Sequence, residues 1–159
     1  STNIHKVLED ILALEKDTLT RKNGRFEQIY DPSLPPIEAD EDQLKQVFLN
    51  LIKNAIEASR KGGKVQIITR LSSGYAIKST SSSVPQQNIV IEIIDSGEGV
   101  DEKTQKKLFT PFHTTKPKGS GLGLPISLKI VEDHHGKIKV TSEKDLGTTV
   151  QVFLPTRKR

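Results

Sequence analysis

Apolar residues recur at intervals of three and four positions in three segments, which predicts three amphipathic helices. We expect these helices at residues 3–16, 43–59 and 122–133. Asp40 lies three residues before Gln43, in the arrangement of a capping box that opens the second helix. The expected buried positions are Ile4, Val7, Leu8, Ile11, Leu12 and Leu14 in the first helix, and Leu44, Val47, Phe48, Leu51, Ile52, Ala55 and Ile56 in the second.

Shorter segments, in which apolar residues alternate with polar ones or follow one another directly, predict β-strands. We expect strands at residues 26–30, 65–71, 89–94, 137–142 and 148–154. Residues 101–108 indicate a short helix, and the Ser/Thr-rich residues 72–88 indicate a hairpin or loop. Strands and helices do not alternate regularly and no segment repeats, so we expect a mixed α/β fold rather than a doubly wound parallel sheet.

The composition narrows the class of protein. The chain has 159 residues, the length of one domain, and its 33% of hydrophobic residues can form a core. The absence of Cys excludes a disulfide scaffold, thiolate zinc sites and a Cys nucleophile. No apolar run reaches the roughly 18 residues of a membrane span, so the sequence predicts a soluble domain without membrane contact. The chain begins at Ser1 and has no Met, from which we expect a fragment of a longer protein.

The charge pattern bears on the kind of partner. Lys and Arg exceed Asp and Glu by only four, and aromatic residues make up 4% of the chain. Nucleic-acid-binding surfaces show a basic stripe interleaved with aromatic residues, and this sequence has none. We therefore expect no nucleic-acid partner.

The densest glycine cluster extends from Gly119 to Gly123, directly before the third predicted helix. Glycines let backbone N–H groups approach an anion, and a helix N-terminus favours negative charge, so the cluster is a candidate phosphate-binding loop. A flexible turn is the alternative interpretation. The cluster matches neither a dinucleotide-binding fingerprint, which needs a strand directly before it, nor a P-loop, which needs Gly-Lys-Ser/Thr.

Two further polar features border predicted apolar elements. Asn50 and Asn54 lie four residues apart and so share a face of the second helix. Their carbonyl oxygens suit Mg²⁺ carried by substrate phosphates, the alternative being hydrogen bonds to neighbouring backbone. Asp95 ends the third predicted strand and precedes Gly97 and Gly99. Its carboxylate can accept hydrogen bonds from an exocyclic amine such as that of adenine, the alternative being an Asp-Ser-Gly turn.

In their order and spacing these features resemble the GHKL superfamily, and more narrowly the catalytic, ATP-binding domain of bacterial sensor histidine kinases. The matching segments are residues 46–58 (N box), 95–100 (first glycine box), 108–112 (F box), 119–124 (second glycine box) and 147–149 (closing box). Residues 3–8, 30–36, 43–54 and 114–124 resemble nitrogen-regulation kinases of the NtrB type.

The resemblance implies a Bergerat fold, an α+β two-layer sandwich in which helices cover one face of a mixed β-sheet. Residues 1–20 would form an N-terminal helix on the side of the linker from a dimerisation domain. Residues 21–159 would form the ATP-binding catalytic domain, with an ATP lid at residues 110–119 and a variable loop at residues 72–88.

The resemblance also implies a site for ATP and Mg²⁺. Asp95 would hold the adenine amine, with Thr148 nearby, and Asn54 would coordinate Mg²⁺. Asn50, one turn earlier, and Lys116, which would reach the γ-phosphate, would be the catalytic side chains. The remaining nucleotide-binding positions would be Lys53, Gly97, Gly99, Gly119, Ser120, Gly121, Leu122, Gly123 and Leu124.

Two departures from the family pattern bear on the chemistry. Glu57 stands where many histidine kinases have a basic residue, so Lys53 or Lys116 would supply that charge. Asn50 stands where hydrolytic members of the superfamily place a Glu general base. An amide cannot take a proton from water, which favours a kinase over an ATPase. A self-contained ATPase or switch and a nucleotide-dependent docking module are the alternatives.

A histidine kinase needs a phosphoacceptor His on a dimerisation helix, and none of His5, His113, His134 and His135 has the required sequence context. The resemblance therefore implies a cytoplasmic domain that transfers the γ-phosphoryl of ATP to a His outside this chain. Onward transfer would go to a response regulator of the NtrC type, and a PII-type signal protein would be a further partner. His134 and His135 end the third predicted helix, where a cationic side chain would favour the helix dipole.

Overall fold

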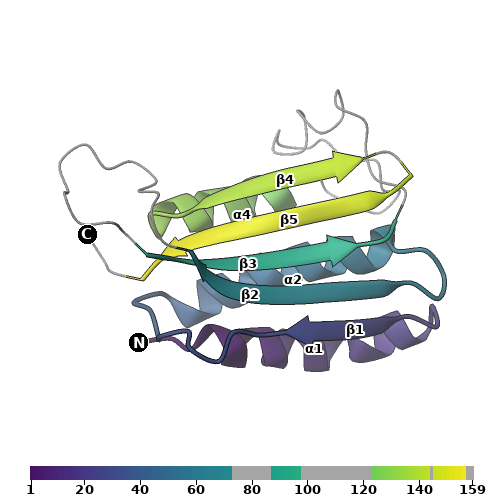
Figure 1. The fold of residues 1–159 in the computed structure, drawn as a ribbon, viewed down its shortest axis with the longest axis horizontal. Coiled ribbons are helices and arrows are strands. Elements are labelled where there is room, and N and C mark those ends of the chain that lie inside the picture. The colour runs from purple at the N-terminus through teal and green to yellow at the C-terminus, as the bar shows by residue number, and fades with distance from the viewer. Residues whose placement is uncertain (73–86, 98–122, 144, 157–159) are drawn as a thin grey trace.

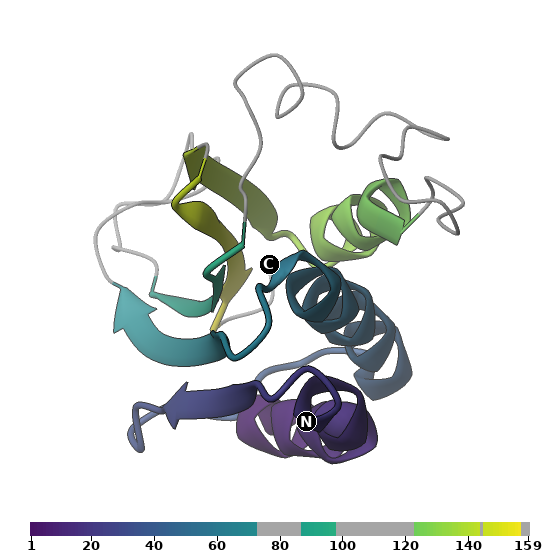
Figure 2. The same ribbon diagram turned by 90° about the vertical axis from the view of Figure 1, so that its right-hand side faces the viewer.

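The computed structural model describes residues 1–72, 87–97, 123–143 and 145–156, which form a sheet with helices packed against one face (Figure 1). The elements are α1 (Ile4–Thr20), β1 (Arg25–Ile29), α2 (Glu41–Ala58), β2 (Lys64–Ser72), β3 (Asn88–Asp95), α4 (Gly123–Asp133), β4 (Lys137–Glu143) and β5 (Gly147–Pro155). Seen along the strands, the helices all lie on the same side of the sheet (Figure 2). This two-layer arrangement confirms the expected α+β sandwich.

The sheet is mixed, as the motifs implied. Its strand order is β1-β2-β3-β5-β4, with β1 parallel to β2 and all other neighbours antiparallel. The parallel pair follows from the connection through α2, because a parallel neighbour requires a long crossover. In the pairing of β3 with β5, Asp95 lies opposite Thr148, so the ends of two predicted motifs meet at one edge of the sheet.

The core lies between the sheet and the helices, with α2 between α1 and α4 (Figure 2). All seven α2 positions expected from the spacing are buried, and Phe48 is fully inaccessible. The strands contribute alternate residues to this core, namely Val65, Ile67, Ile89, Ile91, Ile93, Val152 and Leu154. All five predicted strands are confirmed, and none of their bounds differs by more than one residue.

The first helix differs from the prediction in length and in one buried position. It continues to Thr20 because Leu19 extends the buried stripe. Leu14 is 69% exposed, since at 100° per residue it lies on the far side of the helix from Leu12. Glu15 takes the buried position instead and is 8% exposed. The predicted helix at residues 101–108 and most of the loop at residues 72–88 lie outside the described residues.

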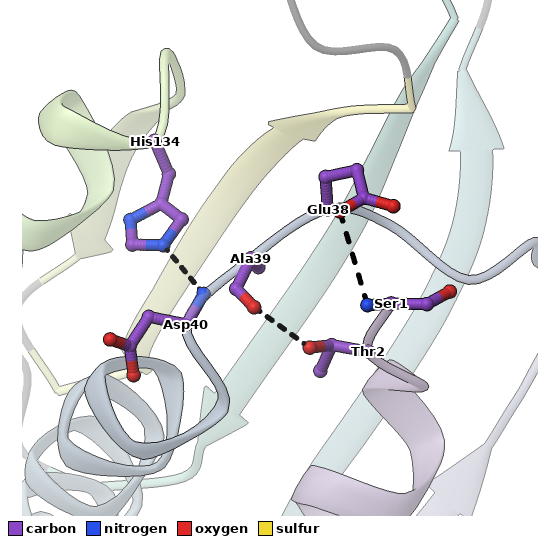
Figure 3. Close-up of polar contacts among 6 residues, drawn as sticks. All are labelled: Ser1, Thr2, Glu38, Ala39, Asp40 and His134. Carbon is purple, nitrogen blue, oxygen red and sulfur yellow. Dashed lines mark hydrogen bonds and ion pairs between the residues drawn. The ribbon is translucent and has the colours of Figure 1, made fainter.

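Hydrogen bonds connect the start of the chain, the start of α2 and the end of α4 (Figure 3). Thr2 pairs with Ile37 through two backbone hydrogen bonds, and its hydroxyl donates to Ala39 O at 3.0 Å. Asp40 is the N-cap of α2, and its own backbone N–H donates to His134 Nε2 at 3.1 Å. These contacts hold the 37–40 segment between α1 and α4.

His134 caps α4 by hydrogen bonding rather than by charge. Its Nδ1 lies 2.8 Å from Ile130 O, which can only accept, so Nδ1 carries a proton. Its Nε2 accepts from Asp40 N–H, so the ring is neutral in this arrangement. The expected cation at this helix end is therefore wrong for His134, although the capping position is confirmed. His135, at φ 64°, adopts the left-handed conformation that ends the helix.

Among the described residues, none of the helices has the length and apolar character of a membrane span.

Candidate nucleotide-binding site

Asp95 ends β3, is only 7% exposed, and has its carboxylate held in a defined orientation. Its Oδ1 accepts hydrogen bonds from the backbone N–H of Gly97 at 2.9 Å and of Thr148 at 3.3 Å. The first bond forms the Asp-Ser-Gly turn that the sequence offered as an alternative. The second comes from β5, so the same carboxylate also joins two neighbouring strands. The turn and a binding role are thus compatible.

Two glycines pack closely around Asp95. A Cβ at Gly97 would lie 2.0 Å from Ala58 O, so only glycine lets the chain after β3 approach the last turn of α2 this closely. Gly147 has φ +108°, and a Cβ there would lie 2.2 Å from Asp95 O. The ends of β3 and α2 and the start of β5 therefore converge at Asp95. Gly99 lies outside the described residues.

One face of α2 leads from this point towards α4. Ala58, Asn54 and Asn50 are spaced by four residues, so they line one side of the helix over about 12 Å. At the far end, Asn50 Nδ2 lies 3.5 Å from Gly123 O and 3.4 Å from Ser127 Oγ, both in α4. Asn54 is half-buried between the two ends. The structure thus places both predicted Asn residues on a line that starts beside Asp95.

The line ends at the N-terminus of α4, which begins at Gly123 and has 11 residues. The first backbone N–H groups of a helix have no partner within it, and together with the helix dipole they attract anions. Gly123 and Leu124, which the sequence predicts to bind phosphate, are the first two residues of this helix. A Cβ at Gly123 would lie 3.8 Å from Asn50 Cγ, an ordinary contact, so packing alone does not require this glycine. The predicted site residues Lys116, Gly119, Ser120, Gly121 and Leu122 lie outside the described residues.

Lys53 is directed towards α1 instead of α4. Its Nζ lies 3.9 Å from Glu15 Oε1, and this carboxylate is the buried charge of α1. Asn50, on the same helix, is in contact with α4. The structure therefore gives Lys53 an ion-pair partner on α1, whereas Asn50 contacts α4.

Sequence reasoning missed two side chains that shape this end of the molecule. Lys22 Nζ donates to three carbonyl oxygens at the end of α2, those of Ile56 at 2.8 Å, Ser59 at 3.0 Å and Glu57 at 3.2 Å. A cation stabilises a helix C-terminus, but α2 itself has no basic residue in its last turn. Lys22 comes from a segment 34 or more residues earlier, so no local pattern indicates this contact. Ser142 Oγ lies 2.8 Å from Thr148 Oγ1, a cross-strand contact that no sequence spacing indicates.

Two surface hollows lined by described residues lie away from Asp95. One, of about 400 Å³, lies between the 37–40 segment and the end of α4. The other, of about 470 Å³, lies between α1 and β1. Nor does any group of three His, Asp or Glu side chains in the described parts of the chain form a metal site. The features that favour a nucleotide are thus the carboxylate, the Asn line and the helix N-terminus.

Comparison with known proteins agrees with this geometry. Residues 39–158 match the family model described as histidine kinase-, DNA gyrase B- and HSP90-like ATPase. Sporulation kinase E of Bacillus subtilis (strain 168) is 35% identical over 156 residues, which cover 98% of this chain and 20% of that protein. The sensory histidine kinase/phosphatase NtrB of Rhizobium leguminosarum bv. phaseoli is 41% identical over 160 residues, covering 98% of this chain and 41% of that protein. The chain thus spans about a fifth to two fifths of the length of these relatives.

Solved structures show the same fold. The catalytic domain of histidine kinase ThkA is 31% identical and has a TM-score of 0.77, with 97% of this chain and 93% of that chain covered. A structure of ThkA in complex with the response regulator protein TrrA is 29% identical, with a TM-score of 0.74 over 99% of this chain and 42% of that chain. The chain belongs to the histidine kinase-, DNA gyrase B- and HSP90-like ATPase family, and within it has the fold of a histidine kinase catalytic domain.

Proposed function

We propose that this chain is the catalytic domain of a two-component sensor histidine kinase, which transfers the γ-phosphoryl of Mg·ATP to a His on a separate dimerisation domain. One observation carries the proposal. Three features follow one another alongside α2: the buried Asp95 carboxylate, the line of Asn54 and Asn50, and the N-terminus of α4. Their order is that of the adenine base, the metal-bound phosphates and the terminal phosphate of a bound ATP.

The residue roles follow from this order. Asp95 accepts a hydrogen bond from the adenine amine beside Thr148, with Gly97 and Gly99 shaping the pocket. Asn54 holds Mg²⁺ through its amide oxygen, a hard ligand of the kind that this ion prefers. The ion supplies neutralisation of the phosphate charge during transfer, which in phosphoryl transfer is the main requirement besides positioning.

The phosphates lie at the start of α4 in this proposal. The backbone N–H groups of Gly123 and Leu124 bind them, as do those of Gly119, Ser120, Gly121 and Leu122. Lys116 reaches the γ-phosphate. We leave Lys53 out of this set, because its Nζ pairs with Glu15 of α1.

A hydrolytic ATPase is the second candidate, and Asn50 argues against it. Its Nδ2 group is directed at Gly123 O and Ser127 Oγ, so this amide serves as a donor that links α2 to α4. An amide has no basic site for taking a proton from water. We therefore expect slow hydrolysis by the chain alone.

The partners follow from the same proposal. The phosphoryl group passes from the dimerisation domain to a response regulator, and the existence of a ThkA complex with TrrA supports this class of partner. The identity of 41% to an NtrB protein supports an NtrC-type regulator, nitrogen regulation and a PII-type signal protein as a further partner. A place in the cytoplasm accords with these roles.

Nucleotide titration with and without Mg²⁺ tests the proposal. The parent chain should bind ATP and ADP, and Asp95→Asn should weaken binding by about 10- to 100-fold, because a hydrogen bond to a charged group contributes about 1.5–3 kcal/mol. Asp145→Asn is the matched control, since Asp145 is an exposed turn residue at φ 70° that Asn tolerates. Equal affinities of the parent and Asp95→Asn would remove the adenine assignment.

Transfer itself needs a second component. When a dimerisation domain carrying the phosphoacceptor His is added together with ATP, acid-labile phosphohistidine should form on it. Rapid ATP hydrolysis by the chain alone, without phosphohistidine, would favour the ATPase instead.

A further inference from the structure

The hydroxyl groups of Ser142 and Thr148 form a pair beside Asp95. The two residues are cross-strand partners in the pairing of β4 with β5, and their Oγ atoms lie 2.8 Å apart. Ser142 Oγ also lies 3.2 Å from Gly147 O. Thr148 is at the same time the strand partner of Asp95, and its backbone N–H donates to Asp95 Oδ1.

The side chain of Thr148 shares the face of the sheet that carries Asp95. Along β5, Thr148 alternates in step with Val152 and Leu154, which are buried under the helices. Side chains that lie directly opposite each other on one face of an antiparallel pair have Cβ atoms about 4.5–5.5 Å apart. The Thr148 hydroxyl and the Asp95 carboxylate therefore border the same space.

The number of available protons indicates whether the Thr148 hydroxyl acts as a hydrogen-bond donor or acceptor towards a ligand. A hydroxyl has one proton to donate and two lone pairs with which to accept. Gly147 O can only accept, so the contact at 3.2 Å uses the proton of Ser142. Either hydroxyl could donate in the contact between them, and the direction of Ser142 Oγ towards Gly147 O favours Thr148 as the donor. In that arrangement Thr148 Oγ1 presents lone pairs, and no proton, to a ligand.

We propose that Ser142 is a positioning residue that makes Thr148 a hydrogen-bond acceptor and thereby selects purines with an exocyclic amine over purines with a carbonyl at the same position. This inference rests on the proposed function, because it assumes that the base lies beside Asp95. An amine has two hydrogens, and the Asp95 carboxylate and the Thr148 hydroxyl provide two acceptors. A carbonyl oxygen placed there meets lone pairs on both sides and stays unpaired, which weakens binding.

Titrations with ATP and inosine triphosphate (ITP) test this inference, since ITP has a carbonyl where ATP has the amine. The parent should bind ATP more tightly than ITP. In Ser142→Ala the proton of Thr148 is released, so the hydroxyl can turn and donate to the carbonyl of ITP. We expect ITP to bind more tightly to this variant than to the parent, and the ratio of the two dissociation constants to narrow by about tenfold. A gain in ITP affinity is not a result that loss of structure produces.

Two variants and one control accompany this measurement. Ser142→Thr keeps the hydroxyl and should retain the parent ratio, whereas Ser142→Cys, a weaker acceptor, should give an intermediate ratio. Thr141→Ala removes a hydroxyl from the exposed face of the same strand and should change neither affinity. If Ser142→Ala does not fold, the Thr and Cys variants still separate the two explanations, because an unchanged ratio in Ser142→Cys overturns the inference.

The inference and the proposed function fail in different ways. Equal ATP-to-ITP ratios in the parent and Ser142→Ala overturn the role of Ser142, even when Asp95→Asn weakens ATP binding. An Asp95→Asn variant that binds ATP as the parent does overturns the adenine site, and the inference with it.

Discussion

The close approach of Gly97 to the end of α2 makes Gly97→Ala the most demanding test of the site geometry. A Cβ at this position would lie 2.0 Å from Ala58 O and 2.7 Å from Ala58 C, whereas ordinary contact begins near 3.4 Å. Both atoms belong to the backbone, so neither can turn away, and the chain after β3 must move by about 1 Å or more.

The expected size of the effect follows from two opposing contributions. Overpacking in a well-packed region lowers the free energy of unfolding by about 1–3 kcal/mol, and rigid backbone atoms place Gly97 at or above the upper end. Replacing Gly by Ala also reduces the entropy of the unfolded chain, which returns about 0.4–1 kcal/mol. The net loss of about 2 kcal/mol should lower the melting temperature by about 4–8 °C in a chain of this length.

Nucleotide binding should suffer as well, because Gly97 N–H donates a backbone hydrogen bond to Asp95 Oδ1. We expect ATP affinity to fall by at least tenfold in Gly97→Ala, measured by calorimetric titration at a temperature where thermal melting shows the variant to be folded.

Alanine substitutions at two other glycines serve as controls for Gly97→Ala. Gly123→Ala places its Cβ 3.8 Å from Asn50 Cγ and should leave stability within about 0.5 kcal/mol of the parent. Gly62 has open space around it but φ +79°, so Gly62→Ala should show backbone strain of about 1–2 kcal/mol without an effect on ATP affinity. The reasoning is refuted if Gly97→Ala melts and binds ATP like the parent, or if Gly123→Ala is equally damaging.

Three further predictions concern the described residues away from the carboxylate. Burial lowers the pKa of His5, and this effect exceeds that of nearby carboxylates, which raise it. As the pH falls, the unfolded chain therefore takes up a proton at a higher pH than the folded chain does. The free energy of unfolding should decrease as the pH falls below about 6.5. His5→Phe should flatten this slope in urea unfolding, and an unchanged slope would contradict the assignment. Lys53→Ala should lower the free energy of unfolding by about 1 kcal/mol, because it leaves the buried Glu15 without its ion pair. ATP affinity should stay unchanged. A large loss of ATP affinity would instead support nucleotide contact by Lys53. His134→Ala removes the hydrogen bonds to Asp40 N–H and to Ile130 O, and should lower the free energy of unfolding by about 1–2 kcal/mol in thermal melts. An unchanged melting temperature would contradict this expectation.

The helices and strands could be predicted because each has a local signal that the tertiary structure reinforces. The α2 segment combines an N-cap at Asp40 with a stripe of apolar residues, and both agree with the observed helix. The error at Leu14 has a physical cause. Hydrophobicity alone assigned it to the buried face, while the buried position belongs to Glu15, whose charge is tolerated because Lys53 lies 3.9 Å away. Spacing along one helix does not reveal a partner on another.

Some residues of the candidate site could be predicted from the sequence, and others could not. Asn50, Asn54 and Asp95 were recognisable because polar residues at the margin of apolar elements need partners, and because their order resembles a known family. Sequence spacing did not show that Ser142 contacts Thr148 or that Lys22 caps α2, since these contacts join residues brought together by strand pairing and helix packing.

The sequence by itself determined the elements, the class of fold and the chemical inventory of the site, because periodicity, caps and residue types are local properties. The tertiary structure decided the geometry in which that inventory works. The pairing of β3 with β5 places Thr148 opposite Asp95, and the close approach of Gly97 to Ala58 joins this pair to α2. The contact of Asn50 with Gly123 then aligns α2 with the start of α4. Each of these contacts depends on backbone positions far apart in the chain, which no local pattern of side chains specifies.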